Sequence, residues 1–188
     1  KSRESGDARR QAIALNALGQ VASARGDLSR AEELLLESVG VARAAGLEPS
    51  VGQGLLRLGD VARRRGAPGE ALALYQEAFD TFCGLGQKVH VACALSSIGS
   101  ALVDSGRAGD AREKYTESLE IFHDIGYGAG TARALIGIAG IALTRGDAER
   151  GAKLLGAVHE LVDRGGHRLQ PDDGEAFTAL QGSARKKL

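Results

Sequence analysis

The fold is decided by residues 55–75, which read LLRLGDVARRRGAPGEALALY. Leu55 and Leu58 stand three residues apart and therefore lie on one face of a helix. After Gly66 the pattern resumes, with Ala71 and Tyr75 four residues apart on the face of a second helix. Two apolar helical stretches separated by a short glycine turn predict a helical hairpin.

The hairpin recurs along the chain, and glycines mark each copy at a fixed period of 40 residues. One set follows the second helix of each hairpin, another follows the first helix, and a third lies inside the first helix. A fixed period of this length is typical of a repeat protein. In that order the sets are Gly6, Gly46, Gly86, Gly126 and Gly166; Gly26, Gly66, Gly106 and Gly146; and Gly19, Gly59 and Gly99, with Ala139 and Gly140 at the fourth position.

The first two glycine sets are predicted to end helices, because glycine readily takes the left-handed conformation of a helix C-terminus. Asp27, Pro68 and Asp147 follow such glycines and suit the start of the next helix. The third set lies in a helix interior, where glycine costs roughly 1 kcal/mol relative to alanine. We therefore expect a neighbouring helix to pass close to these glycines.

These residues resemble the tetratricopeptide repeat family, in a variant with a longer second helix. The family pattern is a large apolar residue, Leu-Gly, then an alanine and an aromatic residue. It appears in the second unit as Leu55, Leu58, Gly59, Ala71 and Tyr75, and in the third as Leu95, Ile98, Gly99, Ala111 and Tyr115. The fourth unit departs most from the pattern, with Gly151 and Leu155 in place of the alanine and the aromatic residue.

The resemblance implies an all-α, right-handed superhelical solenoid of antiparallel helix hairpins with a C-terminal capping helix. It implies one domain over residues 1–188, with repeats at about 7–46, 47–86, 87–126 and 127–166 and the capping helix at about 171–187. The repeat helices are predicted at 8–25, 28–45, 50–65, 68–84, 88–105, 108–125, 130–145 and 147–164.

Both ends of the chain suggest a larger parent protein. Gly6 belongs to the capping set, so Lys1 to Ser5 are interpreted as the tail of an earlier helix. Residues 148–157, which read AERGAKLLGA, and the acidic helix that starts at Pro171 resemble the C-terminal repeats of large bacterial LuxR-type and SARP-type ATPase regulators. That resemblance implies a cytoplasmic fragment that senses or transmits a signal in transcription regulation.

Composition and motifs disfavour several classes of function. The 24 basic residues balance the 24 acidic ones, which disfavours direct nucleic-acid binding. No apolar run reaches the roughly 18 residues that a membrane span needs. The four histidines lack metal-ligand spacing, and no nucleophile has an assignable base. The glycine-rich residues 126–130 are interpreted as a turn between repeats. We therefore expect no enzyme activity, no catalytic residue, no cofactor and no metal.

In the family that the chain resembles, the first helix of each hairpin lines a concave groove that binds partners. The resemblance implies a polar groove in which Arg57, Arg63 and Arg64 form a basic strip beside Asp60, and hence a protein or peptide partner that carries acidic groups. Leu56 and Ser96 stand where a clamp for a C-terminal carboxylate would need polar donors. The predicted groove residues are Asn16, Gln20, Gln53, Arg57, Asp60, Arg63, Arg64, Ser96, Ser97, Ser100, Asp104 and Arg133.

Three functions stay open at the level of sequence. The first is a protein or peptide interaction scaffold. The second is a structural spacer or a self-association module, in which exposed end repeats pair with another copy of the chain. The third, an enzyme with a site hidden in the superhelix, is disfavoured because no acid-base or phosphate-binding group of residues is found.

Overall fold

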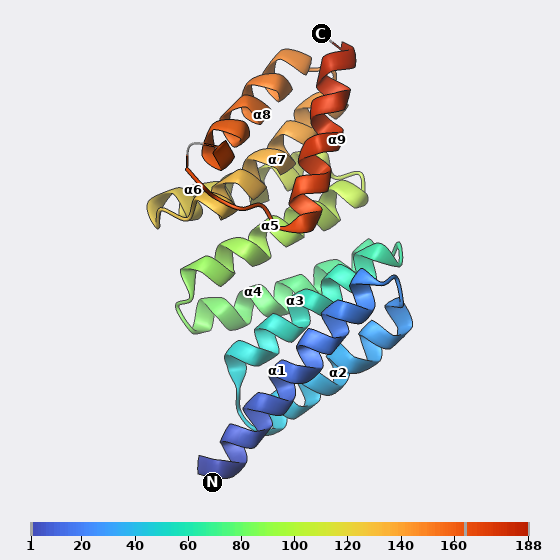
Figure 1. The fold of residues 1–188 in the computed structure, drawn as a ribbon, viewed down its shortest axis with the longest axis vertical. Helices are drawn as coiled ribbons and strands as arrows, with labels where there is room; N and C mark the ends of the chain where they lie inside the picture. Colours follow the sequence, from blue (N-terminus) through green and yellow to red (C-terminus); the bar gives the residue numbers. More distant parts are fainter. Residues whose placement is uncertain (1, 164, 188) are drawn as a thin grey trace.

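A computed structural model describes the backbone of residues 2–163 and 165–187 and the side chains of residues 6–163 and 165–186. Lys1, assigned above to an earlier helix, and Arg164, the predicted end of the eighth helix, lie outside the described residues. Within those ranges the chain forms nine α-helices and no strand, as Figure 1 shows. They are α1 (Ser2–Ala24), α2 (Leu28–Ala44), α3 (Glu48–Arg64), α4 (Pro68–Gly84), α5 (Lys88–Asp104), α6 (Ala108–Asp124), α7 (Gly128–Thr144), α8 (Ala148–Asp163) and α9 (Pro171–Lys187).

Glycine turns join consecutive helices, as the sequence predicts. The described residues with positive φ are all glycines, and each belongs to one of the two predicted capping sets: Gly26, Gly46, Gly66, Gly86, Gly106, Gly126, Gly146 and Gly166. Asp27 and Asp147 then cap the helices that follow. Their Oδ1 atoms accept hydrogen bonds from the backbone N–H groups of Arg30 and Arg150, each at 3.1 Å.

Two local predictions are wrong. Gly6 is not a cap, because α1 runs through it without a break and its φ is not positive. Residues 128–130 are not part of the turn, because α7 already begins at Gly128. Gly130 is needed inside that helix, since a Cβ atom there would lie 2.4 Å from Cδ1 of Phe122.

The glycines inside the first helices allow close packing within each hairpin. A Cβ atom at Gly59 would lie 2.3 Å from Cε1 of Tyr75, and one at Gly99 would lie 3.1 Å from the ring of Tyr115. Both tyrosines are buried. The predicted close approach of a neighbouring helix at these glycines is therefore confirmed.

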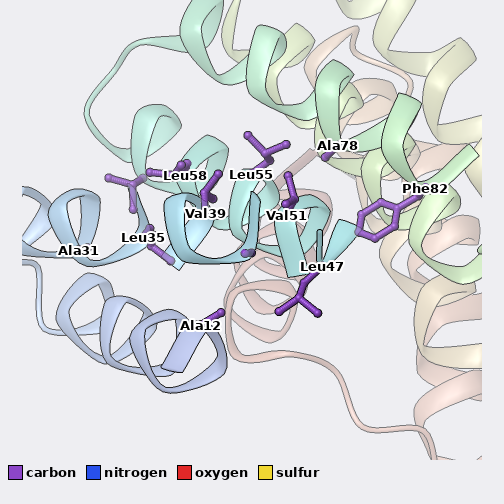
Figure 2. Packing of buried hydrophobic residues seen from close by; sticks show 12 residues of the cluster. Ala12, Ala31, Leu35, Val39, Leu47, Val51, Leu55, Leu58, Ala78 and Phe82 are labelled. Carbon is purple, nitrogen blue, oxygen red and sulfur yellow. The ribbon is translucent and has the colours of Figure 1, made fainter. Parts of the chain in front are cut away.

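Apolar side chains from successive hairpins form the core. Figure 2 shows Phe82 of α4 directed toward Val51 of α3 and toward Leu47, the residue before α3. Phe82 is fully buried, and its ring stacks on that of His90 with a centroid distance of 4.7 Å. One aromatic residue thus joins the second hairpin to the third.

The last helix covers the final hairpin. In α9, Phe177, Leu180 and Ala184 pack against apolar residues of α7 and α8. Leu180 lies over Gly140, where a Cβ atom would be 3.6 Å from Cδ1 of the leucine. Figure 1 shows α9 beside both helices at one end of the stack. A helix therefore covers the end of the solenoid, as predicted for residues 171–187.

Candidate partner-binding groove

The first helices of the hairpins form the inner wall of the solenoid. The backbones of α1 and α3, of α3 and α5, and of α5 and α7 approach within 8 Å of each other. Over the described residues, α2, α4, α6 and α8 make no such approach to one another. A stack that is closer on one side curves toward that side, so the surface formed by α1, α3, α5 and α7 is the concave one. We call this surface the groove.

Most of the predicted groove residues can meet a partner, because all except Ser96 are partly or fully exposed. Ser96 is only 1% exposed. Its hydroxyl group lies 2.7 Å from that of Ser118, which in turn donates to the carbonyl oxygen of Ala92. The prediction for Ser96 is therefore wrong, because the side chain lies between α5 and α6 and not on the open wall.

Asp60 is fixed at the centre of the α3 wall by two donors. The hydroxyl group of Tyr75 donates to Oδ1 at 2.7 Å, and Nη1 of Arg57 donates to Oδ2 at 3.3 Å. Burial raises the pKa of Tyr75, and the negative charge of Asp60 raises it further. Tyr75 thus remains a neutral donor, and it holds the carboxylate at the groove surface.

Arg63 and Arg64 join neighbouring hairpins. Nε of Arg63 donates to Oδ2 of Asp104 at 2.6 Å, which links α3 to α5. Nη1 of Arg64 donates to Oγ of Ser23 at 2.7 Å, which links α3 to α1. The predicted basic strip is thus neutralised by acids at Arg57 and Arg63. Arg64 has no carboxylate partner among the described residues.

Small side chains make room on the α5 and α7 part of the wall. Ser97 and Ser100 are half-buried on α5, and the hydroxyl group of Ser100 lies 2.9 Å from that of Tyr115. The Tyr115 ring fills the space beside Gly137 of α7, where a Cβ atom would be 2.4 Å from Cζ. The hydroxyl groups in this section of the groove therefore lie close to the helix backbone, with room for a partner above them.

At its C-terminal end the groove is partly covered by the chain itself. Nε of Arg133 donates to Oδ2 of Asp173 at 3.0 Å, and the two side chains are 32% and 17% exposed. Burial raises the pKa of Asp173, and the positive charge of Arg133 opposes that rise. Sequence reasoning missed Asp173, although it stands one repeat period, 40 residues, after Arg133.

The described residues lack the groups that two other classes of site need. No cluster of three or more His, Cys, Asp or Glu side chains among residues 6–163 and 165–186 could hold a metal ion. None of the helices described is long and apolar enough to cross a bilayer.

The comparisons with known proteins agree with this geometry. Residues 10–83 match the family profile described as tetratricopeptide repeat. No curated protein matches the chain. Among solved structures, BtubC (BKLC) from P. vanneervenii superposes with a TM-score of 0.70 at 16% identity, over 85% of this chain and 66% of that one.

Two further structures share the fold. A Rap protein complexed with competence and sporulation factor superposes with a TM-score of 0.74 at 12% identity, over 94% of this chain and 54% of that one. A putative kinesin light chain from Podospora anserina, with nearly identical TPR-like repeats, gives 0.68 at 17% identity, over 93% and 84%. The chain thus spans about two thirds of BtubC and about half of the Rap protein. At these identities the likeness shows the fold alone.

The fold and the groove define an all-α helical repeat solenoid, the architecture of protein-interaction scaffolds. The family match covers the first two hairpins, and the same packing continues through the others. Residues 10–83 are therefore tetratricopeptide repeats.

Proposed function

We propose that the groove binds a protein or peptide partner through the predicted residues that remain exposed. The observation that carries the proposal is the row of polar side chains along α1, α3, α5 and α7, in which Asp60, Arg63 and Asp104 are held in fixed positions by hydrogen bonds. A wall with fixed donors and acceptors loses little conformational entropy when a ligand binds. The Rap protein that shares the fold is complexed with a factor, which supports this use of such a scaffold.

We further propose that the partner presents a carboxylate to Arg64. This guanidinium group is exposed, and hydroxyl and carbonyl oxygens of Ser23 are its partners in the structure. A carboxylate would make stronger, charge-assisted hydrogen bonds than these neutral oxygens. Arg57 is also available, because its bond to Asp60 is long and exposed.

The proposed cellular role is the sensory or signal-transmitting part of a bacterial transcriptional regulator in the cytoplasm. The resemblance of residues 148–157 and of the acidic helix at Pro171 to LuxR-type and SARP-type regulators supports this role. In this proposal the fragment neither catalyses a reaction nor binds nucleic acid, and other domains of the parent protein act on DNA.

The test of the groove is a pull-down from the extract of the source cell. The double variant Arg57→Glu/Arg64→Glu is expected to lose the partners that the wild-type chain retains, because two attractive charges become repulsive ones. Circular dichroism checks that the variant is folded. Arg30→Glu, an exposed charge reversal on α2, is the matched control and should retain the partners. Equal retention by the double variant in low and moderate salt contradicts the site.

A second candidate function is self-association through the first hairpin. Leu18 is 55% exposed and Val21 is 48% exposed, whereas the equivalent residues one period later, Leu58 and Val61, are buried against the preceding hairpin. The α1 helix thus presents an apolar face of the kind that the later repeats bury. A second copy of the chain could cover this face through a symmetric contact.

Sedimentation velocity distinguishes this candidate from a monomeric scaffold. If self-association is correct, the wild-type chain sediments as a dimer at micromolar concentration, and Leu18→Glu sediments as a monomer, because the charge cannot be buried without a partner. A wild-type chain that remains monomeric at every concentration excludes the candidate.

A further inference from the structure

A small cavity outside the groove is lined by three exposed arginine residues. It has a volume of about 130 Å³ and lies between α6, the end of α7 and the start of α8. Its polar lining consists of Arg112, Arg145, Arg150 and Asp147, and its apolar lining of Ile138, Ile141 and Ala142. None of the predicted groove residues lines it.

The positive charges of this cavity have no partner in the chain. Over the described residues, Arg112, Arg145 and Arg150 take part in no side-chain hydrogen bond or ion pair, although most other arginines in the hairpins do. Asp147, the one acid in the lining, caps α8 by accepting from the backbone N–H of Arg150 at 3.1 Å. Three positive charges and one negative charge therefore leave the cavity strongly basic.

The earlier repeats can be compared with this cavity, because each hairpin from the second onward has an equivalent junction. At a junction, the turn between the two helices of a hairpin lies beside the second helix of the preceding hairpin. At the junction one repeat period earlier, Leu72 and Ser105 replace Arg112 and Arg145, and Asp110 replaces Arg150. At the first junction the equivalent residues are Glu32, Arg65 and Glu70. There Nη1 of Arg65 donates to both carboxylate oxygens of Glu32, each at 2.7 Å.

The third junction thus places Arg112 where the first junction has the acid that neutralises its arginine. Packing does not require this arrangement, because the same hairpin junction forms with Glu32 and with Leu72 at that position. Like charges that face one cavity repel each other, so the arrangement is stabilised when an anion enters.

We propose that this cavity binds a phosphoryl group, either free or carried by another molecule. A phosphoryl group near pH 7 carries about 1.5 to 2 negative charges and three strong acceptor oxygens, which matches three guanidinium forks better than a carboxylate with one charge and two oxygens. The site is distinct from the proposed groove, and it stands or falls independently of the groove partner.

The test titrates the whole 188-residue chain with inorganic phosphate at pH near 7.5 and constant ionic strength, followed by calorimetry. Arg112→Glu copies the first junction and should pair with Arg145, so it is expected to fold and to bind phosphate at least about tenfold more weakly. Arg112→Leu copies the second junction and gives the same answer if Arg112→Glu fails to fold. Arg25→Glu, an equal charge change in the first interhelical turn, is the control and should leave binding unchanged.

Two further ligands identify the chemistry that is bound. O-phosphoserine is expected to bind about as tightly as inorganic phosphate if the site accepts a phosphorylated molecule, and more weakly if it accepts only the free ion. Acetate is expected to bind at least about tenfold more weakly than phosphate. Equal phosphate affinity of the wild type and both Arg112 variants, or acetate that binds as tightly as phosphate, overturns the proposal.

Discussion

Gly59→Leu is expected to lower the free energy of unfolding by roughly 1 to 3 kcal/mol, although leucine is the better helix former. Any Cβ atom at this position would lie 2.3 Å from the Tyr75 ring. That ring is fully buried, and its hydroxyl group is bonded to Asp60. The ring therefore cannot move aside without breaking this hydrogen bond, which also holds Asp60 at the groove surface. Urea unfolding, monitored by circular dichroism, measures the change.

Gly40→Leu is the matched control for this substitution. Gly40 also lies inside a helix, α2, but it is exposed, and a Cβ atom added there would meet open space out to 4 Å. The same exchange is expected to stabilise the protein there by up to about 1 kcal/mol, because only helix propensity changes. The same exchange of glycine for leucine should thus lower the free energy of unfolding at Gly59 and raise it at Gly40. A Gly59→Leu protein that unfolds at higher urea than the wild type would show that Gly59 does not face Tyr75.

The hairpins could be predicted from sequence because their signals are local. A glycine at a helix C-terminus and an acid at the next N-terminus act within one turn, so Gly26 and Asp27 already indicate the turn. Gly6 shows the limit of this reasoning. It has the period of a capping glycine, but glycine at φ below zero is also tolerated in a helix, and α1 simply continues through it.

The groove could be predicted only in part, because its contacts join different hairpins. The spacing of Arg57, Asp60 and Arg64 along one helix indicates which side chains share a face, and the Arg57 to Asp60 pair is present. Spacing within a helix does not show that Arg63 meets Asp104, which is 41 residues away. Such pairs depend on how the repeats stack.

Ser96 shows a second reason for the partial prediction. Its position in the repeat suggests the groove wall, but α6 carries Ser118 at hydrogen-bonding distance, and the hydroxyl group of Ser96 is bonded to that of Ser118 in the interior. A serine on the boundary between two faces of a helix can turn either way. The choice is made by the residue on the neighbouring helix, which helical periodicity does not include.

Phe82→Ala is expected to lower the free energy of unfolding by roughly 3 to 5 kcal/mol, because it empties a fully buried position between the second and third hairpins. Within the second hairpin the same ring lies against Gly52 of α3, where a Cβ atom would lie 2.6 Å from Cζ of the ring. Gly52→Ala alone should therefore destabilise the protein by roughly 1 to 3 kcal/mol. Urea unfolding of both single variants measures these losses.

The two substitutions are expected to be strongly coupled. In the Phe82→Ala protein the ring is absent, so the methyl group added by Gly52→Ala enters the vacated space and also improves helix propensity. Gly52→Ala should then stabilise that protein, and the double-mutant cycle should give a coupling free energy of about 0.5 to 3 kcal/mol or more. Ala152→Gly, on α8 in the separate apolar cluster that α9 covers, should instead add to either variant without coupling. If Gly52→Ala costs the same with and without the Phe82 ring, the two residues are not in contact, and the ring does not fill the space beside Gly52 in the second hairpin.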